Sequence, residues 1–122
     1  MKQVLIVDDA VTVRMYHKDL MGKCGFATDE AANGIEALEK VLSKEFDLLI
    51  VDVNMPKMDG YRFVTEVRKN ADIFHLPVIM VSTEAQSIDQ QRSLSVGANH
   101  YIVKPAVPDA LMLHAKLLVG EY

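Results

Sequence analysis

The sequence predicts an α/β fold: a five-stranded parallel sheet with helices on both faces, in a single domain of residues 1–122. Two observations lead to this prediction. Short apolar runs rich in β-branched residues recur along the chain, and each is followed by a segment with the apolar spacing of a helix. A strict alternation of strands and helices is typical of a parallel sheet covered by helices.

Five runs are expected to be strands, and they are Val4–Val7, Ala27–Ala31, Leu48–Val51, Val78–Val81 and Tyr101–Val103. The first, third and fourth of these runs are apolar throughout. Such runs are expected of strands that are covered on both faces, as in a parallel sheet. The second run is more polar and is the weakest of the five predictions.

The segments between the runs have the spacing of amphipathic helices. Their apolar positions are Val13, Tyr16, Leu20, Met21 and Cys24, then Ala37, Leu38, Val41 and Leu42, then Phe63, Val64 and Val67. Asn33 and Gly34 open the second of these helices, and Asp59 is a suitable cap for the third. The segment 86–96 has few apolar residues, so we expect its helix to pack weakly.

Composition limits the classes of function. The chain has a net charge of −4, which argues against direct binding to nucleic acid, and it has no apolar run long enough to cross a membrane. Its one cysteine, Cys24, favours a reducing, cytoplasmic setting. The four histidines show no metal-ligand spacing, and we expect all of them at the surface: His17, His75, His100 and His114.

Polar residues follow four of the predicted strands. They are Asp8 and Asp9 after the first, Asp52 after the third, Ser82 after the fourth and Lys104 after the fifth. The carboxyl ends of parallel strands meet at one edge of the sheet, where ligands bind. Clustered carboxylates need a cation, and Mg²⁺ prefers oxygen ligands and phosphate. A nearby lysine and hydroxyl suit a phosphoryl group, so the pattern predicts phosphoryl transfer to an aspartate.

These motifs resemble the response-regulator receiver family of two-component systems, over the chain from Val4 to the last helix. The matching segments are Asp8-Asp9, Val51–Gly60, Val81–Ala85, Gly97-Ala98 and Val103–Pro105. Among receivers, the chain is most similar to the single-domain chemotaxis type. The resemblance implies a flavodoxin-like receiver fold with strand order 2-1-3-4-5.

The resemblance also implies a role for each acidic residue at this edge. Asp52 is the phosphoacceptor. Asp9 binds Mg²⁺ directly, and Asp8 acts more through water. Asn54 offers its main-chain carbonyl to the metal, and its side chain influences the rate of dephosphorylation.

The remaining roles concern the phosphoryl group and the response to it. Ser82 and Lys104 bind the phosphoryl group, and the rotamer of Tyr101 follows Ser82. Glu84 tunes the lifetime of the phosphorylated form. Thr83 stands where many receivers have Ala or Gly, and it is expected to restrict access.

The implied function is a phosphoacceptor switch rather than an enzyme acting on other substrates. A histidine kinase or phosphotransfer protein supplies the phosphoryl group. The change is expected around segments 86–96 and 101–103 and the last helix, which then control an output protein, for example the flagellar motor switch in chemotaxis. Alternatives are a receiver-like module that binds partners without phosphorylation, and the receiver part of a longer regulator. The two aspartates after the first strand would repel the phosphate of FMN, which argues against a flavodoxin-like electron carrier. A phosphatase of the haloacid-dehalogenase type needs a second acid two residues after its aspartyl nucleophile, and this chain has Asn54 at that place.

The last helix has more apolar surface than one face can bury. In the family register, the residues facing the sheet are Leu111, Ala115 and Leu118. At about 100° per residue, Leu113 and Leu117 then point outward, and Met112 flanks them. We therefore expect a partner surface here, for a homodimer or for a docked protein.

Overall fold

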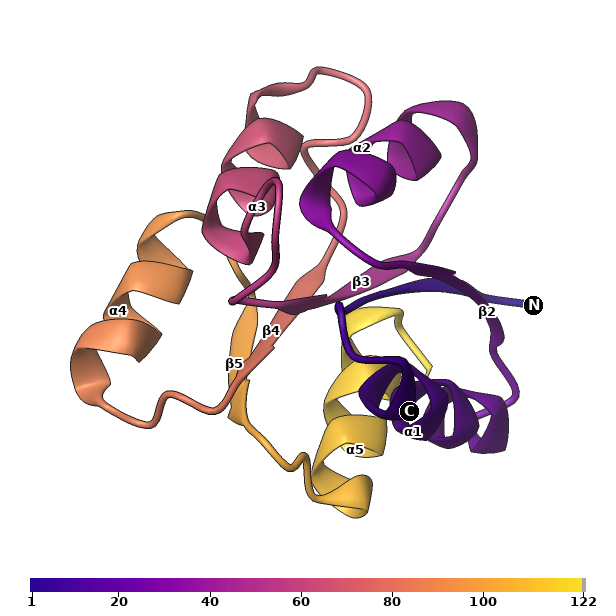
Figure 1. Cartoon of the computed structure of the whole chain (residues 1–122). Coiled ribbons are helices and arrows are strands. Elements are labelled where there is room, and N and C mark those ends of the chain that lie inside the picture. Colours follow the sequence, from indigo (N-terminus) through magenta and orange to yellow (C-terminus); the bar gives the residue numbers. More distant parts are fainter. Residues whose placement is uncertain (122) are drawn as a thin grey trace.

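The computed structural model describes residues 1–121, which form five strands and five helices in alternation (Figure 1). The strands are Gln3–Val7 (β1), Ala27–Ala31 (β2), Leu48–Asp52 (β3), Val78–Ser82 (β4) and His100–Val103 (β5). The helices are Val11–Lys23 (α1), Gly34–Ser43 (α2), Gly60–Lys69 (α3), Ser87–Ser95 (α4) and Pro108–Leu118 (α5). All five predicted strands are confirmed, and Asp52 and Ser82 are the last residues of their strands.

The strands form one parallel sheet in the order β2-β1-β3-β4-β5, which confirms the predicted topology. Because β3 is central, its carboxyl end has neighbours on both sides. Val7 lies beside Val51, and Asp52 lies beside Val81. The ends of β1, β3 and β4 are therefore nearly level at one edge of the sheet.

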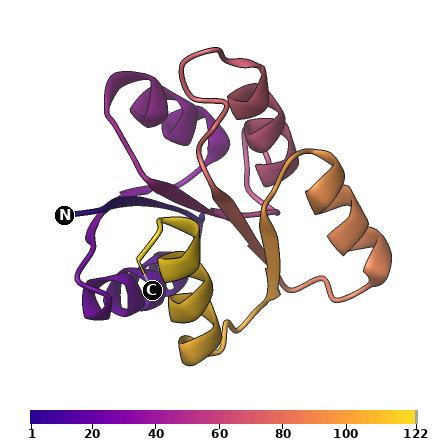
Figure 2. The same ribbon diagram turned by 180° about the vertical axis from the view of Figure 1, so that it is seen from behind.

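Helices cover both faces of the sheet: α1 and α5 lie on one side, and α2, α3 and α4 lie on the other (Figures 1 and 2). Successive side chains of a strand point to opposite faces, and the core divides accordingly. In β1, Val4 and Ile6 belong to the core under α1 and α5, whereas Leu5 and Val7 belong to the core under α2 and α3.

The predicted helix starts are confirmed by their caps. Asn33 accepts a hydrogen bond from the N–H of Glu36 at 2.9 Å, and Asp59 accepts one from the N–H of Arg62 at 2.8 Å. Each cap satisfies a main-chain donor that the first turn of a helix leaves without a partner. Among residues 1–121, no helix combines the length and the apolar character needed to span a membrane.

The expectation that all four histidines lie at the surface is wrong for His17, whose side chain is only 1% exposed. Helix spacing gives the reason. His17 lies four residues after Val13 and four before Met21, so these side chains share the buried stripe of α1. Tyr16, which we expected on this stripe, is 36% exposed and donates its hydroxyl to the carbonyl of Ala106 at 2.7 Å.

The helix α4 packs weakly, as expected from its composition. Ser93 is its one fully buried residue, and Ile88 and Leu94 are exposed. Burial of apolar surface is what fixes most helices to a sheet, so α4 is held less firmly than its neighbours.

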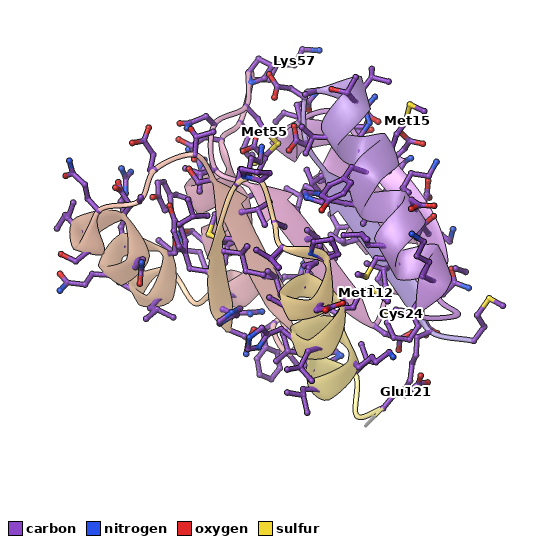
Figure 3. All side chains as sticks on the ribbon, turned by 90° about the horizontal axis from the view of Figure 1, so that it is seen from below. Met15, Cys24, Met55, Lys57, Met112 and Glu121 are labelled. Atoms are coloured by element: carbon purple, nitrogen blue, oxygen red, sulfur yellow. The ribbon has the colours of Figure 1, made fainter. Side chains whose placement is uncertain are left out.

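In α5, Leu111 and Ala115 are fully buried, while Leu113 and Leu117 are exposed by 54% and 46%. Met112 is half-buried and packs against the core under α1 and α5, on the side of α5 that faces α1 (Figure 3). The outward apolar surface of this helix is therefore made by Leu113 and Leu117, and Met112 contributes mainly to packing.

Candidate metal and phosphoryl site

The structure brings the three predicted carboxylates together at the carboxyl edge of the sheet. Oxygens of Asp8, Asp9 and Asp52 all lie within 4.8 Å of one another. Asp8 and Asp52 are buried, and Asp9 is exposed. Two buried carboxylates beside a third create a concentration of negative charge that requires cations.

Lys104 supplies one cation to this cluster. Its ammonium Nζ lies 2.7 Å from Oδ2 of Asp8 and 3.0 Å from Oδ1 of Asp52. The core under α1 and α5 includes Ile6, Ile50 and Ile102. Each of these residues lies two positions before a charged residue of the site, Asp8, Asp52 or Lys104. Because side chains two positions apart in a strand point to the same face, the three charged side chains share one face and meet there.

One ammonium does not compensate for two buried carboxylates. Burial raises the pKa of Asp52, the hydrogen bond from Lys104 opposes this, and the charge of Asp8 adds to the rise. The net effect raises the pKa of Asp52 to about 6. Burial by itself would lower the pKa of Lys104, but its bonds to both carboxylates outweigh burial and raise that pKa. Lys104 is therefore firmly charged, and Asp52 retains an affinity for a further cation.

The side chain of Asp8 is held in a fixed orientation. Its Oδ1 accepts a hydrogen bond from the N–H of Ala10 at 2.9 Å, and its Oδ2 faces Lys104. The guanidinium of Arg14 donates to the main-chain carbonyl of Asp8 at 2.6 Å. Both oxygens of Asp8 are thus engaged within the protein, whereas the carboxylate of Asp9 faces solvent.

The loop between β3 and α3 is folded tightly against the end of β3. The N–H of Gly60 donates to the carbonyl of Val53 at 2.8 Å, and a Cβ atom at Gly60 would lie 2.2 Å from the carbonyl oxygen of Asp52. Only glycine permits this approach. Figure 3 shows Lys57 projecting from this loop at the end of the molecule opposite Cys24, and Asn54 is exposed in the same loop.

Ser82 and Tyr101 lie on the other face of the sheet, and both form hydrogen bonds with the main chain of Glu84. Ser82 is fully buried, and its Oγ accepts a hydrogen bond from the N–H of Glu84 at 3.1 Å. The hydroxyl of Tyr101 donates to the carbonyl of the same residue at 2.5 Å. Thr83 and the side chain of Glu84 are exposed. The loop leading to α4 is therefore tied to both residues by its main chain.

His17 is the residue near this site that the sequence interpretation missed. With Tyr16, Thr83 and Lys104 it lines a cavity of ≈ 400 Å³ beside the carboxylates. Its Nδ1 is buried and has no hydrogen-bond partner among residues 1–121, and burial lowers the pKa of the ring. The ring is therefore neutral at neutral pH. The apolar stripe of α1, at positions 13, 17, 20 and 21, was the available sign of its burial.

Comparison with known proteins identifies the family to which these features correspond. Residues 4–116 match the response regulator receiver domain. The chemotaxis protein CheY1 of Helicobacter pylori is 35% identical over 120 residues, which cover 97% of both chains. The sensor protein EvgS of Escherichia coli is 37% identical over 115 residues, which cover 94% of this chain but 9% of EvgS. The structure of CheY4 from Vibrio cholerae superimposes with a TM-score of 0.90 at 36% identity, covering 97% of this chain and 98% of CheY4.

The raised pKa of Asp52 predicts that Asp52→Asn stabilises the metal-free protein above pH 6. Since folding raises this pKa from 3.8 to about 6, the folded state loses stability as the pH rises through that interval and the carboxyl ionises. Asparagine does not ionise, so at pH 8 we expect a gain of about 1–3 kcal/mol in the free energy of unfolding. Urea titrations with a chelator at pH 8 and pH 5 measure this, and the gain shrinks at pH 5.

Asp59→Asn is the matched control, because Asp59 is exposed and asparagine preserves a helix cap. This variant should match the wild type at both pH values. Equal or lower stability of Asp52→Asn at pH 8 contradicts the electrostatic account of the site.

Proposed function

The chain belongs to the response regulator receiver domain family, and we propose that Asp52 is the phosphoacceptor of a phosphorylation-regulated signalling switch. One observation carries the assignment of the residue. Asp52 ends the central strand, is buried, and lies 3.0 Å from Lys104 and close to two further carboxylates. A carboxylate with the ammonium of Lys104 on one side and metal-binding carboxylates on the other is suited to accept a phosphoryl group.

Mg²⁺ fits the donor set. Asp8, Asp9 and Asp52 offer hard oxygen ligands within a small volume, which is what Mg²⁺ prefers. We propose that Asp9 and Asp52 hold the ion directly with the main-chain carbonyl of Asn54, and that Asp8, engaged by Lys104 and Ala10, acts through water. Bound Mg²⁺ supplies positive charge next to the phosphoryl oxygens.

In the proposed transfer, a carboxylate oxygen of Asp52 bonds to phosphorus while the bond between phosphorus and the imidazole nitrogen of the donor histidine breaks. The leaving imidazole takes up a proton and departs neutral. Lys104 is placed to bind one phosphoryl oxygen, and the Ser82 hydroxyl is placed to donate to another. Both act by position and charge, which carry most of the catalysis in this class of reaction.

The switch follows from the bonds at Glu84. The hydroxyl of Ser82 can donate to a phosphoryl oxygen while its Oγ still accepts from the N–H of Glu84. The loop that begins at Thr83 is then drawn toward the phosphoryl group and held at both ends of this contact, and Tyr101 moves with it. Because α4 is weakly packed, the new position of the loop is passed on to α4.

Three exposed residues surround the mouth of the site and are proposed to set its rates: Asn54, Thr83 and Glu84. Their side chains are free to meet the attacking water or the phosphoryl donor. Thr83 also lines the cavity beside Lys104, so its side chain is proposed to narrow the approach to the site.

The proposed phosphoryl donor is a histidine kinase or phosphotransfer protein. Exposed apolar side chains lie at the start of α1 and before α5, on Val11, Met15 and Val107. Exposed apolar side chains of this kind near the site suit docking of a protein rather than a small phosphate ester alone. The proposed setting is the cytoplasm, where Cys24 stays reduced.

The proposed output surface consists of α4, β5 and α5, with Leu113 and Leu117 as its apolar anchors and Met112 at its margin. It serves an output protein, for which a flagellar motor switch is a candidate because CheY1 and CheY4 are chemotaxis proteins, or a second copy of the chain. The similarity to 9% of EvgS keeps open a role as the receiver part of a longer protein. The alternative function is binding of a partner without phosphorylation.

Phosphorylation of Asp52 is tested by intact mass after incubation with acetyl phosphate and Mg²⁺. We expect the mass of one phosphoryl group to be added to the wild type, because Asp52 is the buried acceptor. Asp52→Asn should add none, and Asp9→Ala should need much more Mg²⁺, about ten-fold or more. The control Asp59→Asn should be modified like the wild type. Modification of Asp52→Asn to the wild-type extent contradicts the assignment.

The switch predicts slower amide hydrogen exchange in residues 83–95 when beryllofluoride, a phosphoryl analogue, binds with Mg²⁺. Capture of the Ser82 hydroxyl orders the loop and, through it, α4. Ser82→Ala should bind the analogue but lose the change in α4. If protection changes around Asp52 alone in the wild type, the chain accepts phosphate without transmitting a signal, and the switch mechanism is wrong.

The output surface predicts that Leu113→Glu with Leu117→Glu abolishes association while phosphorylation persists. Both side chains are half-exposed, so the free energy of unfolding should change by about 0.5 kcal/mol or less. Sedimentation velocity over a concentration series, with and without beryllofluoride, measures self-association. Leu42→Glu, at an equally exposed leucine on α2, is the control. Unfolding of the double variant would identify these leucines as core residues and exclude the surface.

A further inference from the structure

Two histidines that are distant in the sequence lie against each other on one side of the sheet. His100 is the first residue of β5, and His114 lies within α5. Their ring centroids are 3.8 Å apart, with 29° between the ring planes. Both side chains are half-buried, so solvent reaches the pair. Figures 1 and 2 show α5 lying next to β5, and neither histidine belongs to the two clusters of buried core residues.

We propose that His100 and His114 form a binding site for a divalent cation of the Zn²⁺, Ni²⁺ or Cu²⁺ class. Imidazole nitrogen is a preferred ligand of these ions, whereas Mg²⁺ prefers carboxylate and water oxygens. The two rings supply two ligands, and water completes the coordination. The site therefore differs in chemistry from the acidic cluster, and it does not rest on phosphorylation of Asp52.

The two rings must turn and move apart to hold such an ion. Zinc–nitrogen bonds of about 2.0–2.1 Å in a tetrahedral arrangement place two ligand nitrogens roughly 3.4 Å apart and the two imidazole centroids roughly 5 Å apart. The centroids are 3.8 Å apart in the stacked pair, with 29° between the ring planes. Rotation of histidine about its Cβ–Cγ bond is broad, so the rings can turn from stacking to convergence. Metal binding thus replaces the stacking contact of the two rings.

The pair is separate from the phosphoryl site. His100 lies beside Ile79 in the sheet, whereas Val103 lies beside Ser82 at the edge that carries the carboxylates. Three residues of strand place the pair about 10 Å from that edge. A bound ion would join β5 to α5, two elements of the proposed output surface. Such an ion would restrain that surface independently of phosphorylation.

Calorimetric titration of the untagged chain of residues 1–122 with Zn²⁺ tests the site, in excess Mg²⁺ so that the acidic cluster is occupied. We expect saturable binding to the wild type. His100→Phe and His114→Phe should each weaken it about ten-fold or more, since each removes a ligand while an aromatic ring keeps the contact. His75→Ala, which removes an exposed histidine of another loop, should bind like the wild type, as should Asp9→Ala and Asp52→Asn.

Thermal unfolding of each variant establishes that it is folded, and His100→Gln and His114→Gln replace any phenylalanine variant that is not. Imidazole signals in NMR spectra give a second measurement, in which Zn²⁺ should shift His100 and His114 together. The proposal is overturned if the wild type does not bind Zn²⁺ in excess Mg²⁺. It is equally overturned if the histidine variants bind as tightly as the wild type, or if Asp9→Ala abolishes binding.

Discussion

The bridge from Lys104 to Asp8 and Asp52 is the interaction on which the rest of the site depends. One ammonium lies within 3.0 Å of two buried carboxylates that belong to different strands. Without it, burial of both acids at the end of the sheet would cost several kcal/mol per charge. With it, the excess negative charge is reduced but not removed, and this leaves room for a metal ion. The bridge therefore permits a folded site that still needs a further cation.

The alternation of side chains along parallel strands divides the site into two halves. Asp8, Asp52 and Lys104 continue the positions that face α1 and α5, whereas Ser82 and Tyr101 continue those that face α3 and α4. Charge is thus gathered on one side, and the hydroxyl groups are placed on the side of the weakly packed helix. Under the proposed function, a phosphoryl group on Asp52 would lie between the two sides and act on α4 through the hydroxyl groups.

The face of the sheet that α1 and α5 cover carries features that the phosphoryl site does not use. His17 is buried beside Lys104, where its Nδ1 has no partner within the described part of the chain, and His100 stacks on His114 between β5 and α5. These contacts arise because helices bring residues from distant parts of the chain onto the sheet. Leu113 and Leu117 remain exposed for a similar reason: the sheet buries one stripe of α5 and leaves the opposite stripe to solvent or to a partner.

The sequence by itself determined the alternation of strands and helices, the caps at Asn33 and Asp59, and the residues at the strand ends. These features depend on the spacing of apolar residues, on the residues at turns and on the length of each strand, which are all local properties of the chain. The strand order came from the family resemblance, since local patterns do not decide which strands are neighbours. Only the tertiary structure decided that Lys104 contacts both Asp8 and Asp52, that both Ser82 and Tyr101 bind Glu84, and that His100 meets His114. Such contacts depend on how elements pack, and spacing along the chain does not record packing between elements.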